Sequence, residues 1–535
     1  MLTKWVALGT VLAVVVAGVL LVRSGITPSS GLGSAMAAPA AMSEEKACLA
    51  CHTEIQALRT GGKHAQLPCL TCHSKLPEHL SDASIKPITN FDLAVCGTCH
   101  QDQYKTFMTV NLKSGAKIEK ATPTGRAPTL DKLLMGHGFT KDHALPRSHA
   151  FMVMDHLVSD RAYGGRFQFN SWEAIGQVGK AWDLLTDTKR DLAETAKAAN
   201  PTCLMCKTTD MILKWSYMGE PHPKATVSRV SDVVEMAKMI QNPMGCVHCH
   251  DPHAARPRVV RDALIQAVLS RGASPYNKDQ QQPALEVKEF RGYRKIGLLT
   301  RPNSMLQCAQ CHVEYACNPG LDPTTGAKIG LDDPRTNVFP WTNVFEVKKF
   351  YDDLKFRDFR HAVTGAPLIK IQHPEVETFW GSKHEQMGLQ CADCHMPKMS
   401  RSDGTTFTSH WQTSPRNYVR ETCLRCHTKW SETEAVYRID AIQQYTRGKI
   451  RKSEFWLERL IDTFEAAKRA GVSESVLAEA RKHHDTAHVL WEWWTAENSD
   501  GFHNPAQARE ALAQSIQASR KGVDLLETAL KDVKR

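Results

Sequence analysis

Paired cysteines constrain this chain more than any other feature of its sequence. Sixteen of the 17 cysteines form eight Cys-x-x-Cys pairs, and histidine directly follows seven of these pairs. Two thiols three positions apart can bond to the two vinyl groups of one haem, and the adjacent histidine can then bind the iron. A single pair could equally belong to a zinc site or a redox couple, but seven copies indicate haem attachment. The seven motifs are Cys48-Cys51-His52, Cys69-Cys72-His73, Cys96-Cys99-His100, Cys246-Cys249-His250, Cys308-Cys311-His312, Cys391-Cys394-His395 and Cys423-Cys426-His427.

The eighth pair, Cys203 and Cys206, is followed by Lys207 instead of histidine. A lysine amine binds iron only in its deprotonated form, which a buried site beside a metal favours. A haem with this weaker ligand, and no histidine on its other face, leaves the iron open to a substrate. We therefore predict eight covalently attached haem c groups, one of them catalytic. The alternative is a degenerate motif whose haem is purely structural.

Haems that only transfer electrons usually take a second histidine on the other face of the iron. Seven of the 24 histidines lie in the motifs, so seventeen remain. The sequence does not pair them with particular haems, because a lone histidine is more often an ordinary polar residue. Candidates near the motifs, or in the motif-poor stretch before Cys203, are His64, His79, His137, His143, His149, His253, His384 and His410.

The N-terminus predicts export. Lys4 precedes an uncharged apolar run from Trp5 to Val22, and Ala35-Met36-Ala37 has the pattern of a signal-peptide cleavage site. The run is also long enough to span a bilayer, so a retained anchor is the alternative to a cleaved signal. In both cases we expect the rest of the chain in the periplasm.

The net charge of +10 could suggest a nucleic-acid partner. The basic residues are nevertheless spread along the chain, and each haem brings two propionate groups that lysine and arginine must offset. We therefore expect no nucleic-acid partner.

The predicted fold is mainly α: a multihaem cytochrome c with a haem-packed core, short helices, long loops and long C-terminal helices. Proline and glycine are frequent and strand patterns are weak before residue 430. We predict four regions: an export signal or anchor at 1–37, an N-terminal trihaem region at 38–120, a pentahaem catalytic core at 121–430 and a C-terminal helical region at 431–535.

The C-terminal region carries the usual signals of long helices. The cluster of Trp491, Trp493 and Trp494 is interpreted as core or subunit-interface packing, not as part of the chemistry. The helix signals are the apolar spacing of Leu457, Leu460, Ile461 and Phe464, the stop at Gly471, the N-cap Ser473, and Asn504 followed by Pro505.

Several segments together resemble the ammonia-forming cytochrome c nitrite reductases. The five later motifs match the order of the pentahaem enzymes, including the lysine in the first of them, and the N-terminal trio and C-terminal helices resemble the octahaem branch. The remaining matching segments are His312-Val313-Glu314-Tyr315, Gln372-His373-Pro374-Glu375 and Cys394-His395-Met396-Pro397-Lys398. The resemblance covers nearly the whole chain after the export signal.

The resemblance implies four catalytic residues. Lys207 would be the proximal ligand of the active haem, and Arg147 would bind the anion through its forked donors, although Ser148 stands where pentahaem members usually have glycine. His373 would deliver protons, and Tyr315 would donate a hydrogen bond or proton to reduced nitrogen intermediates.

The resemblance also implies further ligands. His384 and His410 match the distal ligands of the haems at Cys423 and Cys246, and His149 would serve another haem of the core. A calcium ion beside the active haem would be bound by oxygen atoms, which calcium prefers. Its ligands would be the Glu314 carboxylate, the backbone carbonyls of Tyr315 and Lys370, and the Gln372 side chain.

Cys317 is the one cysteine outside the pairs, two residues after Tyr315. It could be a small buried apolar residue, as cysteine often is. The resemblance to the octahaem branch instead implies a thioether bond between the Cys317 sulfur and the Tyr315 ring.

The expected activity is the six-electron reduction of nitrite to ammonium, with hydroxylamine and sulfite as further substrates. The alternatives are a hydroxylamine-oxidising octahaem enzyme, whose active haem keeps a Cys-x-x-Cys-His motif, and an electron carrier without catalysis. Expected partners are an electron donor, either a quinol dehydrogenase or a small cytochrome, and further copies of the chain in a trimer or hexamer.

Overall fold

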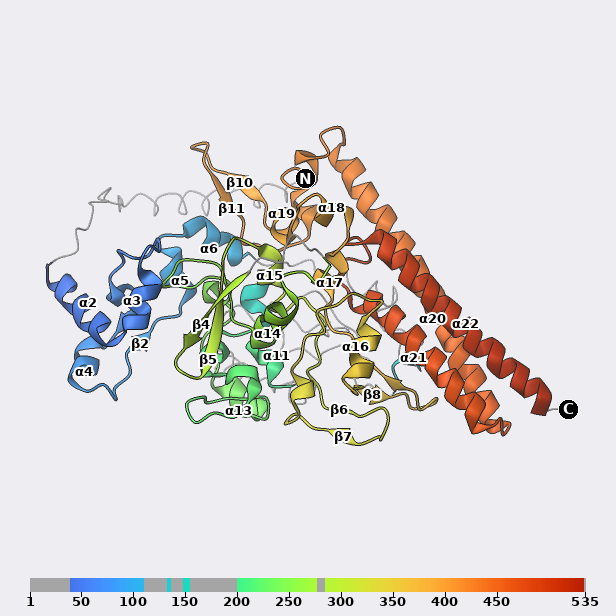
Figure 1. The fold of residues 1–535 in the computed structure, drawn as a ribbon. Coiled ribbons are helices and arrows are strands. Elements are labelled where there is room, and N and C mark those ends of the chain that lie inside the picture. The colour runs from blue at the N-terminus through green and yellow to red at the C-terminus, as the bar shows by residue number, and fades with distance from the viewer. Residues whose placement is uncertain (1–38, 110–131, 136–147, 154–199, 277–283, 534–535) are drawn as a thin grey trace, which may run out of the picture.

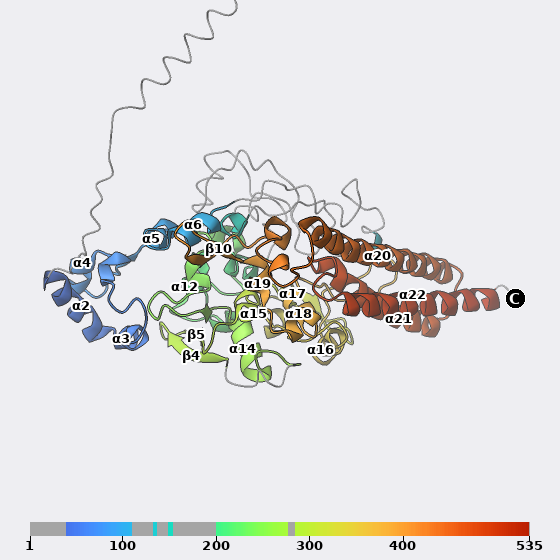
Figure 2. The ribbon, with the colours of Figure 1, turned by 90° about the horizontal axis from the view of Figure 1, so that it is seen from above.

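The computed structural model describes residues 39–109, 132–135, 148–153, 200–276 and 284–533. The N-terminal helices lie at one end of the molecule and three long C-terminal helices at the other, with short elements and loops between them, in two perpendicular views (Figures 1 and 2). The predicted export segment lies outside the described residues. No helix of the described part of the chain is long and apolar enough to cross a membrane.

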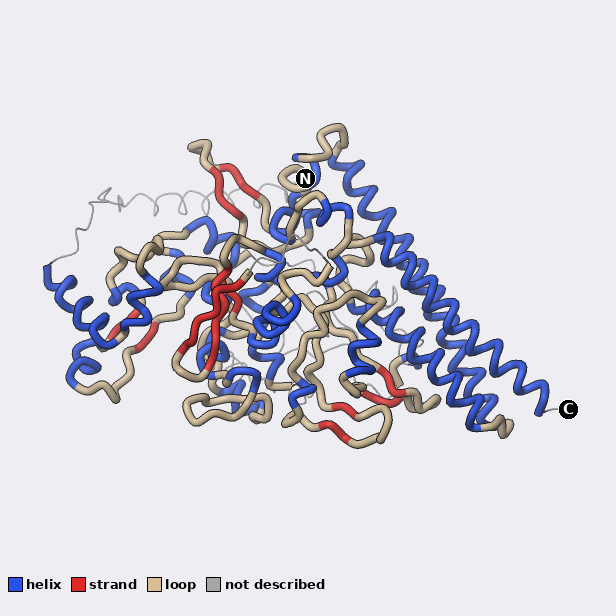
Figure 3. The backbone as a smooth tube through the Cα atoms, in the orientation of Figure 1, coloured by secondary structure: helices blue, strands red, loops and turns tan. Residues whose placement is uncertain are grey.

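Loops make up most of the described residues before 430, with short helices spread among them, as Figure 3 shows. The α-helices are α2 (Pro39–Cys51), α3 (Thr53–Arg59), α4 (Leu76–Ser81), α5 (Leu93–Gly97), α6 (Gln101–Phe107), α11 (Thr202–Met205), α12 (Thr209–Lys214), α13 (Val233–Lys238), α14 (Asp262–Arg271), α15 (Ser304–Cys308), α16 (Val347–Asp353), α17 (Glu375–Phe379), α18 (Lys383–Gln386) and α19 (Cys391–His395). The 3-10 helices are η1 (Cys69–Thr71), η3 (His149–Phe151), η4 (Tyr217–Gly219), η5 (Cys246–His248), η7 (Pro334–Thr336), η8 (Pro415–Tyr418) and η9 (Cys423–Arg425). The predicted mainly α fold with short helices is confirmed.

The strands of the described residues are short and antiparallel. One three-stranded sheet has the order β3-β5-β4, in which Val287 pairs with Gly297 and Val259 also pairs with Gly297 from the other side. Its strands are β3 (Arg258–Val259), β4 (Leu285–Phe290) and β5 (Arg294–Leu299). The two-stranded ribbons are β1 (His73–Ser74) with β2 (Ile88–Thr89), β6 (Gly320–Leu321) with β7 (Lys328–Ile329), β8 (Phe359–Arg360) with β9 (Pro367–Leu368), and β10 (Lys398–Ser400) with β11 (Thr406–Thr408).

Three long helices pack together at the C-terminal end: α20 (Glu432–Arg469), α21 (Glu474–Ala496) and α22 (Pro505–Val533) (Figure 1). The predicted boundaries are confirmed. Gly471 has a φ of 80° after α20, Ser473 precedes α21, and the Asn504 side chain accepts a hydrogen bond from the backbone N–H of Gln507 at 3.2 Å. These are the stop and start signals expected of the three helices.

The largest apolar core lies where α21 and α22 pack against α16 and the segment 369–371. Trp491, Trp493 and Trp494 are fully buried in it, which confirms their interpretation as packing residues. A second core surrounds α14 and α15 and contains Tyr315 and Cys317. The C-terminal helices are therefore joined by an extensive apolar contact to the segment that carries His373.

Gly501 lies in the turn between α21 and α22, and its substitution tests how closely this turn packs against α20. Its φ is 82°, and a Cβ atom there would lie 2.5 Å from Thr446 Oγ1 of α20. We expect Gly501→Ala to lower the free energy of unfolding by about 2 kcal/mol, because left-handed backbone and a steric clash both add cost. The measurement is thermal unfolding followed by far-ultraviolet circular dichroism.

Gly448→Ala is the matched control, because Gly448 lies inside α20 with nothing within 4 Å of its added Cβ. It should stabilise the protein by about 0.5–1 kcal/mol, since alanine is the better helix former. Equal shifts in the two variants would contradict the proposed fit of Gly501.

Candidate functional site

The Cys-x-x-Cys-His motifs form single helical turns. In five motifs the histidine N–H donates to the carbonyl of the first cysteine, at 2.9 Å in four of them and 3.0 Å at His52. Positions i, i+3 and i+4 share one face of a helical turn, so both thiols and the imidazole lie on the same side. All 17 cysteines lie in the described residues, and none forms a disulfide.

Each motif histidine lies opposite the ring of a second histidine. The seven pairs use fourteen different histidines, with ring centroids 6.1–6.4 Å apart. The pairs are His52–His79, His100–His64, His73–His253, His312–His149, His250–His410, His427–His384 and His395–His503. An imidazole nitrogen binds a metal at about 2 Å, so one metal between two rings places their centroids about 6 Å apart. The spacing therefore fits one iron between the two rings of every pair.

Several of these rings form a hydrogen bond through the nitrogen that faces away from the paired ring, and this bond determines which nitrogen carries the proton. The Nδ1 atoms of His64, His79, His395 and His410 hydrogen-bond to backbone carbonyls at 2.7–2.9 Å. A carbonyl only accepts, so Nδ1 carries the proton and the Nε2 lone pair of a neutral ring is available to a metal. Burial lowers the pKa of His395 to about 4, which favours the neutral ligand form.

Six of the eight predicted distal histidines stand in these pairs. His137 and His143 lie outside the described residues. His503, in the turn between α21 and α22, was not among the candidates, yet it lies opposite His395. Its sequence context indicates only the start of α22. The one feature of the sequence that could have identified it is that seven motif histidines require seven distal histidines.

The first motifs have almost no side-chain core of their own. Between residues 45 and 92 only Arg59 and Leu76 are buried. Five large apolar side chains are instead 39–50% exposed: Leu67, Leu70, Leu80, Ile85 and Ile88. Covalently attached haems would cover this apolar surface and supply the missing core.

Thiols of neighbouring motifs lie close enough to shift one another's pKa, which gives the motifs a spatial order. The interacting thiols are Cys48 with Cys69, Cys72 with Cys96, Cys96 with Cys246, Cys249 with Cys308, Cys308 with Cys391, Cys311 with Cys206, and Cys394 with Cys423. The series runs from the N-terminal motifs to the Cys308 motif. It then divides, with one branch toward Cys206 and the other toward Cys391.

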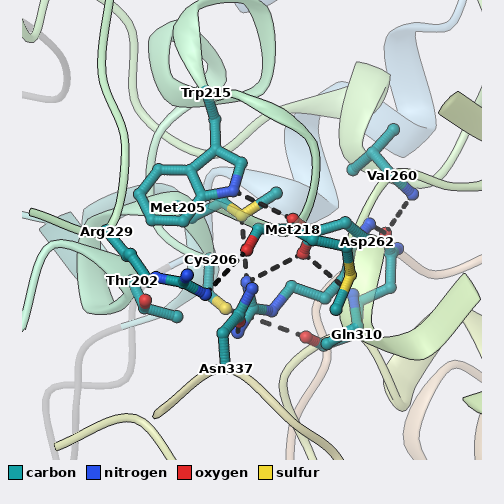
Figure 4. Close-up of polar contacts among 12 residues, drawn as sticks. Thr202, Met205, Cys206, Trp215, Met218, Arg229, Val260, Asp262, Gln310 and Asn337 are labelled. Atoms are coloured by element: carbon teal, nitrogen blue, oxygen red, sulfur yellow. Dashed lines mark hydrogen bonds and ion pairs between the residues drawn. The ribbon is translucent and has the colours of Figure 1, made fainter. Parts of the chain in front are cut away.

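The lysine-containing motif lies on α11 in a buried polar environment. Trp215 Nε1 donates to Asp262 Oδ2 at 3.0 Å, and the Arg261 guanidinium lies 3.0 Å from the Met205 sulfur inside the motif (Figure 4). The Cys206 thiol approaches the Gln310 carbonyl of the neighbouring motif at 3.7 Å. The lysine motif contributes no histidine ring to the seven pairs. The Lys207 Nζ atom donates a hydrogen bond to the Cys203 carbonyl at 2.8 Å.

Two of the predicted catalytic side chains lie together. Tyr315 is buried and His373 is half-buried, with ring centroids 6.5 Å apart, and Phe339 packs against Tyr315 with a centroid distance of 5.8 Å. Burial lowers the pKa of His373 to about 3, and Lys207 is close enough to act on it electrostatically. Arg147 lies outside the described residues.

Buried carboxylates gather at the predicted calcium ligands. Glu314 is fully buried and accepts hydrogen bonds from Tyr351 Oη and from the Gln372 backbone N–H, both at 2.6 Å. Burial raises the pKa of Glu314 to about 8 and that of Asp358 to about 6. The Gln372 Oε1 atom is buried without a hydrogen-bond donor. Buried acids beside an unsatisfied amide oxygen are the chemistry of a hard-cation site, so these residues fit calcium.

Cys317 lies in the same core as Tyr315. It is 2% exposed, and the Gln372 amide Nε2 lies 3.4 Å from its sulfur. Cys317 therefore connects the tyrosine to the acid cluster.

The repeated motifs and the paired histidines define a multihaem cytochrome c. Comparison with known proteins agrees with this class. The sequence model of the cytochrome c552 family matches residues 180–533. Nitrite reductase subunit NrfA of Nitratidesulfovibrio vulgaris is 29% identical over 418 residues, which cover 74% of this chain and 68% of that protein. Cytochrome c-552 of Aliarcobacter butzleri is 27% identical over 407 residues, with coverages of 73% and 68%. The chain belongs to the cytochrome c552 family.

A solved structure shows the same fold. Cytochrome c nitrite reductase from Desulfovibrio desulfuricans, which has two calcium sites, superposes with a TM-score of 0.59 and 24% identity over 82% of this chain and 86% of that one. The family match begins at residue 180, so the three N-terminal motifs lie outside it.

His503 provides a test of the paired arrangement. We expect His503→Ala to retain all covalent haem but to convert the haem at Cys391 and Cys394 from low spin to high spin, because the iron loses its second imidazole. The measurement is the electron paramagnetic resonance spectrum of the oxidised protein. His483→Ala on the neighbouring α21 is the control, since His483 belongs to none of the seven pairs. An unchanged spectrum in His503→Ala would contradict the pairing.

Proposed function

We propose that the chain is a periplasmic octahaem enzyme that reduces nitrite to ammonium at the haem carried by Cys203 and Cys206. One observation carries the proposal. Seven motifs place a histidine opposite a second histidine, whereas the lysine motif contributes none and lies close to the pair Tyr315 and His373. Seven closed sites beside one open site are typical of a reductase supplied by an electron-transfer array. Homology to nitrite reductases supports the substrate class.

When bound, the haem at this motif would supply electrons to the substrate. Lys207 would hold its iron. Arg147 would bind the nitrite oxygens through its forked N–H donors. His373 would pass protons toward the nitrogen, and the Tyr315 hydroxyl would donate to the bound anion and its reduced forms.

Calcium would bind beside this haem and join two active-site segments. Its ligands would be the Glu314 carboxylate, the carbonyls of Tyr315 and Lys370, and the Gln372 side-chain oxygen. The raised pKa of Glu314 and the unsatisfied Gln372 Oε1 support a cation at this position. We further propose hydroxylamine and sulfite as substrates, a quinol dehydrogenase or small cytochrome as electron donor, and a trimer or hexamer as the assembly.

The branched order of the motifs supports rapid electron supply. In the described thiol series, Cys206 lies next to Cys311 of the Cys308 motif. Electrons from the N-terminal and from the C-terminal motifs would therefore both pass through the Cys308 motif before they arrive at the lysine motif. Supply from two directions would keep the open haem reduced and limit the escape of partly reduced nitrogen species.

Lys207 tests the catalytic assignment. We expect Lys207→His to retain eight haems but to lower nitrite turnover by about tenfold or more, because changes close to a metal ligand typically cost 10–100-fold. The measurement is ammonium formation from nitrite with a reduced dye, alongside haem content. Parallel assays with hydroxylamine and sulfite define the substrate range.

Wild-type turnover in Lys207→His would contradict the role of the lysine. A wild-type protein without reductase activity and without a high-spin haem would indicate an electron carrier. Faster hydroxylamine oxidation than nitrite reduction would indicate the oxidase alternative.

Cys317 tests the proposed thioether bond to Tyr315. Bond formation would be a two-electron oxidation that removes one hydrogen from the thiol and one from the ring, with oxidised haem of the chain as the electron acceptor. The crosslinked peptide should therefore be lighter by two hydrogens and resist thiol alkylation. Peptide mass spectrometry measures both, and Cys317→Ser provides the peptide that cannot crosslink. Full alkylation of Cys317 in active, haem-loaded protein would contradict the bond.

A further inference from the structure

Three successive backbone N–H groups beside His373 donate to three different carboxylates, of which two are buried and one, Asp358, is half-buried. Strand β9 ends at Leu368, so the residues that follow have no strand partner in the described ribbon of β8 and β9. The donors and acceptors are Lys370 to Asp358 Oδ2 at 2.8 Å, Ile371 to Glu492 Oε1 at 2.6 Å, and Gln372 to Glu314 Oε2 at 2.6 Å. Side-chain carboxylates thus accept the hydrogen bonds that a neighbouring strand would otherwise accept, and they fix the position of this segment.

Glu492 differs from the other two acceptors because it comes from the C-terminal helix α21. Glu314 and Asp358 belong to the acid cluster of the proposed calcium site, whereas Glu492 is fully buried on the opposite side of the segment. Its second carboxyl oxygen contacts the ring of His488, one helical turn earlier and equally buried. Burying a polar side chain in an apolar core costs free energy unless it is hydrogen-bonded, and the Ile371 N–H is the hydrogen-bond donor to Glu492.

Further polar contacts from the same helix reach the residues after His373. Trp493 Nε1 donates to Thr378 Oγ1 at 2.8 Å. Beyond the end of α21, the Asn498 side chain and backbone donate to Glu375, and Glu375 also contacts the Nδ1 atom of the motif residue His312. The segment from Ile369 to Thr378 is therefore held from the C-terminal side along its length.

We propose that Glu492 is a positioning residue for nitrite reduction, because it fixes Ile371 and through it the backbone that presents His373. This inference rests on the proposed function. Glu492 would act only through the segment that it holds. The C-terminal helices would then be part of the catalytic apparatus and not only a packing or assembly element.

The contacts of Glu492 determine the informative substitutions. Its Oε1 atom accepts the Ile371 N–H and its Oε2 atom lies against His488 Nε2. Burial raises the pKa of Glu492 and lowers that of His488 to about 3, and both shifts favour the uncharged forms. Glutamine keeps the length of the side chain and an oxygen that can accept from Ile371. Methionine has a similar size but cannot accept this hydrogen bond.

The test compares three variants of the haem-loaded, full-length protein. They are Glu492→Met, Glu492→Gln and the control His484→Met. His484 is two turns before Glu492 on α21 and equally buried, but it contacts Thr364 Oγ1 at 2.9 Å instead of the segment beside His373. Two measurements are made: amide hydrogen exchange of the peptide spanning 369–373, and kcat and KM for nitrite.

We expect Glu492→Met to speed exchange at Ile371 and to lower kcat by about 10–100-fold with a smaller change in KM, since small misplacements of catalytic groups have effects of this size. Glu492→Gln and His484→Met should resemble the wild type in both measurements. If Glu492→Met does not yield haem-loaded protein, Glu492→Asp, whose carboxyl group is withdrawn by one methylene, provides the comparison.

Three outcomes would overturn the inference: unchanged exchange and turnover in Glu492→Met, faster exchange with wild-type turnover, or equal losses in His484→Met. The exchange measurement needs no substrate. A wild-type protein that does not reduce nitrite would therefore refute the proposed function, while exchange alone would still decide whether Glu492 holds this segment.

Discussion

The opposed histidine rings are the contact on which the rest of this structure depends. Each pair joins segments that are distant in sequence, and a metal between the rings would turn the pair into a covalent-strength crosslink. His73 and His253 join the N-terminal helices to the core in this way, and His395 and His503 join the core to the C-terminal helices. Around the first motifs this crosslink matters most, because only Arg59 and Leu76 are buried between residues 45 and 92. Folding of the N-terminal region would therefore be coupled to haem attachment.

The second organising feature is the use of buried acids as backbone acceptors. Glu377 accepts the Glu314 N–H at 2.9 Å, and Glu314 accepts the Gln372 N–H in turn. Each carboxylate in this series fixes the backbone of the next segment. A series of this kind accumulates negative charge in a low-dielectric interior, and it becomes stable only if protons or a cation neutralise it. The rigidity of the segment beside His373 and the proposed affinity for a cation would thus have the same origin.

The sequence predicted the repeated motifs, the mainly α fold and the three C-terminal helices, because each depends on local spacing and capping. It also named Tyr315 and His373, which the structure places together, although their catalytic roles remain predictions. His503 and Glu492 were not predicted. Their importance comes from contacts with His395 and Ile371, which only the packing of α21 and the following turn determines. Helix periodicity identifies which residues are buried, but not which backbone group a buried glutamate will meet.

The C-terminal helices look like a separable module in outline, since they extend away from the compact core (Figure 2). Residue 430 nevertheless marks only a change from short to long helices. Glu492, Asn498 and His503 all lie beyond it and contact residues of the core. Exchange of these helices between homologous genes would have to preserve those positions together with their partners. Such recombination would be selected against unless both sides were inherited as one unit, so this boundary should be a poor site for building chimaeras.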